Sequence, residues 1–92
     1  MASVDLNFTK EDRVYVADIV SPGKCIVQIE RKKSGWTTVF SKIDDLDFSE
    51  VAKFPDGPDK KSVIFELDIP KGMPVRIQSN KEVEIAKYVT EG

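Results

Sequence analysis

The chain has 92 residues, with 14 basic and 16 acidic side chains that leave a net charge of −2, no histidine and one cysteine. Without histidine, Ser–His–Asp and Cys–His catalysis and imidazole zinc ligands are excluded, and a single cysteine excludes an internal disulfide or a Cys-x-x-Cys site. The net charge is not that of a general nucleic-acid binder, and no apolar run reaches the ~18 residues of a membrane span. The length predicts one domain over 1–92.

The N-terminal part of the chain alternates apolar and polar residues with a period of two, the spacing of a strand that is buried on one face. This alternation predicts a strand at 4–8, followed by a polar turn at 9–12. A second strand is predicted at 13–20, which is rich in Val, Tyr and Ile and is ended by the Ser-Pro-Gly sequence at 21–23.

The next segment predicts a β-hairpin. Residues 25–30 alternate again, 32–35 read as a hairpin loop, and 36–43 are rich in good strand formers. Gly35 is expected to supply the positive φ that such loops need. Cys25 lies in an apolar stretch with no base or helix N-terminus nearby to lower its pKa, so it is predicted to be a small buried hydrophobe.

An acidic connecting loop is predicted at 44–61. Six acidic side chains and one lysine give residues 44–59 a net charge of −5. Within this loop, Ser49–Phe54 is expected to form one short helical turn with Ser49 as its cap, and 54–59 form a cluster of turn residues. Loops of this length in small domains are usually functional or mobile.

The C-terminal part returns to alternation. Strands are predicted at 62–69, 75–79 and 82–89, separated by turns at 70–74 and 80–81. About seven short strands with turns between them predict an all-β chain that folds as one small antiparallel β-sandwich. A barrel is the alternative closure.

Catalysis and metal binding find little support in the residue pattern. Most carboxylates occupy outward strand positions or the acidic loop, and no histidine activates a serine or threonine, so we expect no enzyme and no cofactor. Asp44, Asp45, Asp47 and Glu50 concentrate the oxygen ligands that calcium prefers, but the glycine of a calcium loop is missing. A solvated acidic loop is predicted, with a bound divalent cation as the alternative.

Protein interaction is the function class that the charges favour. Residues 1–43 carry a net charge of +2 and the remainder −4. A basic hairpin tip and an acidic loop on one small body suit contacts with neighbouring proteins, including copies of itself, and tryptophan is enriched at binding hot spots. The candidate protein-interface residues are Arg31, Lys32, Lys33, Trp36, Asp44, Asp45 and Asp47. The basic cluster beside an aromatic could also hold nucleic acid, but the acidic remainder predicts no nucleic-acid partner.

Two stretches resemble a known group of proteins. The sequence CIVQIERKKSGWTTVF at 25–40 resembles the V-x-L-Q-x-S-x-D-G-x-x-W/F-x-x-V hairpin of small phage virion β-sandwiches. The sequence FELDIPKGMPVRI at 65–77 is similar to their F-x-L-P-x-G-x-x-V-R-V strand–turn–strand, and the order of the two agrees. The chain departs from the pattern in its richer charge and in having Lys33-Ser34-Gly35 where Asp-Gly is common.

Proteins of this group are head decoration, auxiliary capsid and fibre-associated modules. The resemblance implies a non-enzymatic virion structural protein, most specifically an auxiliary capsid protein that binds the assembled phage shell or links it to an appendage. Its implied partners are the major capsid protein, other virion proteins or copies of itself, without nucleic acid or membrane. Its implied location is the virion, after synthesis in the host cytoplasm, which the lack of a signal-peptide pattern suits.

Two other functions stay open from the residues alone. One is a carbohydrate- or ligand-binding β-sandwich, for which Trp36, Tyr15 or Tyr88 would form the platform. The other is a protein-interaction domain of a cellular host, which would be cytoplasmic. Both share the predicted fold and differ from the virion protein only in what they bind.

Overall fold

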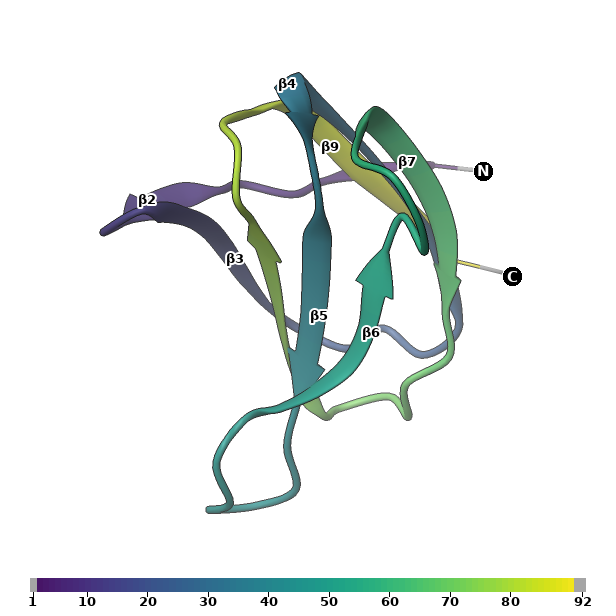
Figure 1. The fold of residues 1–92 in the computed structure, drawn as a ribbon. Coiled ribbons are helices and arrows are strands. Elements are labelled where there is room, and N and C mark those ends of the chain that lie inside the picture. The colour runs from purple at the N-terminus through teal and green to yellow at the C-terminus, as the bar shows by residue number, and fades with distance from the viewer. Residues whose placement is uncertain (1, 91–92) are drawn as a thin grey trace.

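In a computed structural model, which describes residues 2–90, nine strands form two antiparallel sheets packed face to face (Figure 1). The four-stranded sheet has the order β1 (Val4–Asp5), β9 (Val83–Thr90), β4 (Cys25–Gly35), β7 (Lys60–Leu67). The five-stranded sheet has the order β2 (Thr9–Glu11), β3 (Val14–Val20), β8 (Pro74–Ser79), β5 (Thr37–Ser41), β6 (Ser49–Phe54). The predicted all-β sandwich is confirmed. A strand lies within each of the seven predicted segments, although the one predicted at 4–8 is limited to Val4–Asp5, and β2 and β6 are additional.

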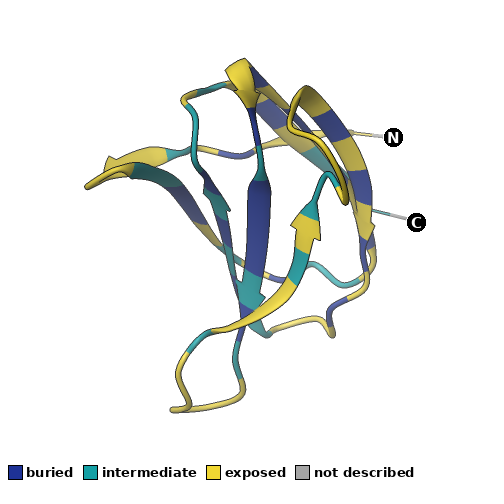
Figure 2. Ribbon diagram, in the orientation of Figure 1, coloured by how far each residue is buried: buried dark blue, intermediate teal, exposed yellow. Residues whose placement is uncertain are grey.

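The core lies between the two sheets and follows the period-two alternation of the sequence. Buried and exposed bands alternate along β4 and β7 (Figure 2), and the register places Val27 of β4 directly opposite Phe65 of β7. From the other sheet, Val39 and Ile77 reach the same interior and are fully buried. The buried core residues are Leu6, Cys25, Val27, Ile29, Val39, Val63, Phe65, Leu67, Ile69, Val75, Ile77 and Ala86. The predicted burial of the single cysteine is confirmed.

One side of the sandwich is closed by a pair of aromatic rings. β6 and β7 are edge strands of the two different sheets. Phe54 at the end of β6 stacks on Phe65 of β7, with ring centroids 4.0 Å apart and an interplanar angle of 4°. The stack therefore joins the layers where hydrogen bonding between strands is absent.

The predicted hairpin loop at 32–35 is wrong. β4 continues through these residues to Gly35, which pairs with Lys60 of β7, and the chain then passes to the other sheet at Trp36. Gly35 is not among the glycines with positive φ. It is required for close approach, because a Cβ atom there would collide with the side chain of Asn80, whose Oδ1 accepts a 2.8 Å hydrogen bond from the Trp36 N–H.

Two further local predictions are wrong because strand pairing overrides local preference. The predicted turn at 9–12 is mostly strand: Thr9–Glu11 pairs with β3, and only Asp12, at φ 58°, begins the reversal. The predicted helical turn at Ser49–Phe54 is β6, which pairs with β5. The acidic loop predicted at 44–61 is therefore divided by β6, and β7 begins before its predicted end.

Candidate functional site

Arg31, predicted to lie on an exposed basic tip, is fully buried. It continues the inward alternation of β4, and its guanidinium donates hydrogen bonds to Thr37 Oγ1 (2.5 Å), the Gly35 carbonyl (2.8 Å) and the Lys60 carbonyl (2.6 Å). Burial lowers the pKa of Arg31, and nearby Asp59 partly opposes this shift. The side chain thus links β4 and β7 of one sheet to β5 of the other, and the structure removes it from the predicted protein-facing surface.

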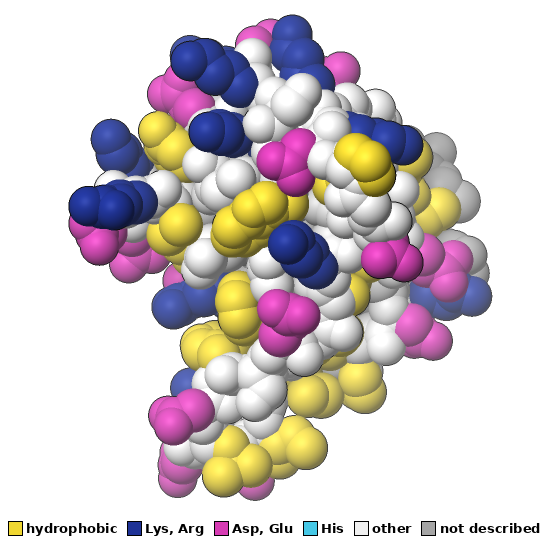
Figure 3. Space-filling view, in the orientation of Figure 1, with side chains coloured by type: hydrophobic (Ala, Val, Ile, Leu, Met, Phe, Trp, Pro, Cys, Tyr) yellow, Lys and Arg dark blue, Asp and Glu magenta, His cyan; other side chains and the backbone are white. Residues whose placement is uncertain are grey.

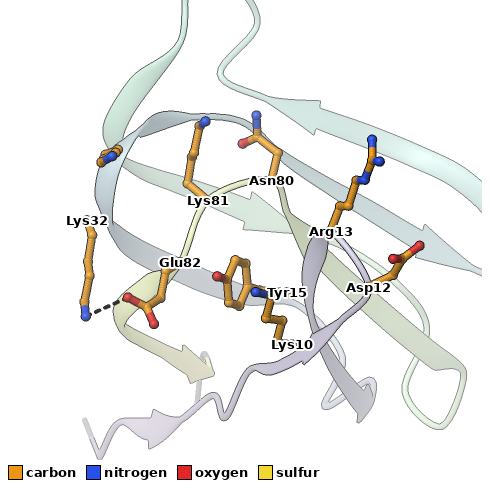
Figure 4. A pocket seen from close by; sticks show the side chains of 9 residues that line it. Lys10, Asp12, Arg13, Tyr15, Lys32, Asn80, Lys81 and Glu82 are labelled. Atoms are coloured by element: carbon orange, nitrogen blue, oxygen red, sulfur yellow. Dashed lines mark ion pairs between the residues drawn. The ribbon is translucent and has the colours of Figure 1, made fainter.

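The other two basic residues of this cluster lie at a groove of about 390 Å³ (Figure 4). Three parts of the chain that are distant in sequence form it: the β2–β3 hairpin, the end of β4 and the turn between β8 and β9. This surface, called the cationic groove below, is lined by Lys10, Asp12, Arg13, Tyr15, Lys32, Lys33, Asn80, Lys81 and Glu82. Five positive and two negative side chains leave it with a net charge of +3.

The cations of the groove are only partly neutralised. Lys32 Nζ lies 2.6 Å from a carboxylate oxygen of Glu82, and the hydrogen bond between them raises the pKa of Lys32. Within residues 2–90, no other lysine or arginine of the groove forms an ion pair. The cationic groove therefore presents unpaired positive charge on a chain whose net charge is negative.

The predicted acidic residues lie in the loop between β5 and β6. Asp44, Asp45 and Asp47 are all exposed there, beside Ile43 (62% exposed) and Leu46 (66% exposed). The Leu46 N–H donates a 3.1 Å hydrogen bond to the Ile43 carbonyl and tightens the turn. This segment, residues 43–47, is called the acidic tip below. In the part of the chain that the structure describes, no group of three or more Cys, Asp or Glu side chains is arranged to hold a metal ion.

Trp36 is half-buried at the point where the chain passes between the sheets. Its backbone is held by Asn80, which also donates its N–H to the Trp36 carbonyl at 3.3 Å. Lys53 Nζ lies 5.1 Å from the centroid of the indole ring, within cation–π range. One face of this candidate anchor is therefore already covered by the chain itself.

A second aromatic–cation cluster, which sequence reasoning missed, lies beside the acidic tip. Lys42 Nζ and the guanidinium carbon of Arg76 each lie 4.8 Å from the centroid of the Phe48 ring. Arg76 is in turn fixed by Asp18, with 2.8 Å between Nε and the carboxylate. This cluster anchors the base of the acidic tip on the five-stranded sheet, because Arg76 belongs to β8 and Asp18 to β3.

The structure does not bring the predicted basic and acidic residues together. Lys32, Lys33 and Trp36 precede the first residue of β5, whereas the acidic tip follows its last residue, so the two groups lie at opposite ends of this strand. In Figure 3 many of the Lys and Arg side chains lie in the upper part of the molecule, interspersed with acidic ones, whereas the protruding β5–β6 loop below shows acidic and hydrophobic side chains. The result is two separate surfaces of opposite charge.

Sequence reasoning also missed most of the cationic groove. Lys10, Arg13 and Lys81 come from turns that are far from 32–33 in the chain. Residues 9–13 and 80–82 each carry as many acidic as basic side chains, and only the pairing of β2 with β3 and of β3 with β8 brings these cations to one place. The single signal in the sequence is that turns in these three regions all carry lysine or arginine.

The thiol of Cys25 provides a direct check on the buried face of β4. The residue is 2% exposed, and burial raises its pKa above the ordinary value. We expect a thiol-reactive disulfide reagent at neutral pH to leave the folded chain unmodified and to react with one equivalent per chain in denaturant. Rapid labelling of the folded chain would contradict the inward position of Cys25.

Comparisons with known proteins do not add to this description. No protein-family model, curated protein sequence or solved structure matches the chain. No helix among residues 2–90 has the length and apolar character needed to cross a membrane. The fold and the two charged surfaces are therefore the features of this chain that bear on its function.

Proposed function

We propose that this protein is a non-enzymatic structural module that binds other proteins, and that it serves as an auxiliary capsid protein on the shell of a virion or between shell and appendage. The observation that carries the proposal is the separation of charge. The cationic groove and the acidic tip lie at opposite ends of β5, and a rigid sandwich lies between them. Such a body can contact two neighbours at once, as a component of a repeating surface must.

The physical requirements of a particle surface agree with this arrangement. Complementary charges select partners and fix register more than they add raw affinity. Many copies on a symmetric shell turn weak individual contacts into strong attachment. The two stretches that resemble virion β-sandwiches, 25–40 and 65–77, are connections between the sheets, from β4 to β5 and from β7 to β8.

A glycan-binding platform receives less support. Sugar-binding faces commonly use exposed aromatic rings, yet Lys53 covers one face of Trp36 and Tyr88 packs against the core. Tyr15 lies in the cationic groove, among lysines. The three aromatic candidates therefore do not form one shared platform.

Fractionation of native source material on a density gradient tests the proposal. We expect the chain, followed by mass spectrometry, to sediment with large particles at a fixed ratio to a major shell protein. Raising the salt concentration to about 1 M should release it, because the proposed contacts are electrostatic and the Debye length falls to about 3 Å. Recovery of the chain only as a free species at the top of the gradient, in low salt, would contradict the proposal.

A further inference from the structure

We propose that the cationic groove receives the acidic tip of a second copy of this chain, so that copies associate head to tail. The inference deepens the proposed function and rests on it in one respect, since it takes the charged ends to be binding surfaces. The inference goes beyond the proposed function because it names a second copy of this chain as the partner. It therefore predicts a property of the purified chain, without any particle present.

Charge is the first argument for this pairing. The cationic groove has a net charge of +3, and Lys10, Arg13, Lys33 and Lys81 have no ion pair within residues 2–90. The acidic tip carries three aspartates and no basic residue. The net charges of the two surfaces are therefore opposite in sign and equal in magnitude, and within residues 2–90 neither the three aspartates nor these four cations form an ion pair.

The apolar content of the tip is the second argument. Ile43, which precedes the aspartates, and Leu46, which lies between two of them, are more than half exposed, so the tip is amphipathic rather than purely acidic. The groove offers the Tyr15 ring and the aliphatic stems of its lysines as apolar surface below the charged groups. A free phosphate or a nucleic-acid backbone would match the charge of the groove but not this apolar surface.

Position is the third argument, because it excludes an intramolecular contact. The acidic tip projects from the body of the molecule beyond the last residue of β5 (Figure 1). The groove lies at the other end of this strand, because its lining residue Asn80 (Figure 4) follows Ser79, which pairs with Thr37 at the start of β5. The tip cannot reach its own groove, so the contact joins two chains through unlike surfaces. Such heterologous contacts build closed rings when the rotation closes and filaments when it does not.

Light scattering of the purified full-length chain across a concentration series is the first test. We expect the weight-average mass to rise with concentration above the 10.3 kDa monomer in low salt and to return to the monomer in about 1 M salt. A constant monomer mass in low salt up to about millimolar concentration, the range of weak binding, would overturn the inference.

Charge-reversal variants then identify the surfaces. The groove variant Arg13→Glu, Lys33→Glu and the tip variant Asp45→Lys, Asp47→Lys change exposed side chains only. Asp44 is left unchanged because its φ of 50° is unfavourable for lysine. We expect each variant alone to be monomeric and an equimolar mixture to regain association, because each supplies the charge that the other lacks.

A third variant, altered outside both charged surfaces, serves as the matched control. Lys61→Glu, Lys71→Glu makes the same change in net charge as the groove variant, at exposed positions outside the groove, and should associate as the unaltered chain does. Equal thermal unfolding midpoints show that all variants fold. Association that survives both reversals, or a mixture that stays monomeric, would overturn the inference. Either result is independent of co-sedimentation with particles, which tests the proposed function separately.

Discussion

Replacing Arg31 by alanine is expected to lower the free energy of unfolding by about 3–5 kcal/mol. The guanidinium is fully buried and donates to Gly35, Thr37 and Lys60, on three strands of both sheets. Its removal leaves two carbonyls and one hydroxyl without their donor in a water-poor interior, and each such group costs roughly 1–3 kcal/mol. The relief from no longer burying a charge offsets only part of this loss.

Urea denaturation followed by circular dichroism measures the effect of the Arg31 substitution. Lys33→Ala, two residues along the same strand but exposed, is the matched control and should change stability by no more than about 0.5 kcal/mol. Arg31→Lys should recover little of the loss, because an ammonium group cannot reproduce the planar fork that reaches several acceptors at once. An Arg31→Ala chain as stable as the unaltered one would show that the buried hydrogen bonds do not join the sheets.

Phe65→Ala is expected to destabilise the fold by about 3–5 kcal/mol. Phe65 is 7% exposed, lies opposite Val27 in the register of β4 and β7, and stacks on Phe54 across the closed side of the sandwich. Truncation opens a cavity in the core and also removes the ring contact between edge strands of the two sheets. Ile64→Ala is the matched control, since Ile64 precedes Phe65 in β7 and is 65% exposed.

A double-mutant cycle separates the ring contact from the cavity. Phe54→Leu, Phe65→Leu and the double variant should give a coupling of about 0.5–1.5 kcal/mol, the range for aromatic pairs. Independent, additive losses would mean that the stacked geometry contributes nothing beyond apolar burial. A loss at Ile64 equal to that at Phe65 would contradict the assigned inward face of β7.

The fold could be predicted from the sequence wherever one face of a strand is buried. In β7 buried and exposed positions alternate from Val63 onward, with Val63, Phe65 and Leu67 inside, although the outward residue Ile64 is apolar. The pattern is informative because burial and the strand period act on each residue separately, without reference to which strand lies alongside. The fold class followed from the same local information, whereas β2 and β6 did not.

The errors have a shared physical cause, which is pairing between distant segments. Residues 32–35 resemble a loop locally, but pairing with β7 and β9 extends β4 to Gly35. Opposite Glu30 and Arg31 of β4 the register of β9 shifts, so Val83 packs against the core while Ile85 is 45% exposed, although a strict period of two places both on one face. A one-residue irregularity reverses the face of every residue beyond it.

The candidate site was predictable only in part for the same reason. Exposure of Asp44, Asp45 and Asp47 follows from their charge in a turn-rich segment. Arg31 was predicted to be exposed because it is charged and is followed by two lysines. Its side chain nevertheless lies on the same face of β4 as Val27 and Ile29, which is the buried face. The cationic groove could be predicted only with knowledge of which turns lie next to one another in the fold.

The order of the four-stranded sheet has a consequence for how this chain folds during its synthesis. No two neighbours in the sheet are consecutive in sequence, and β9, the last of its four strands in chain order, lies between β1 and β4. Until residues 83–90 leave the ribosome, β1 has no strand to pair with and one edge of β4 is bare. The nascent chain therefore exposes sheet edges that attract other chains, and the sandwich closes in one late, cooperative step.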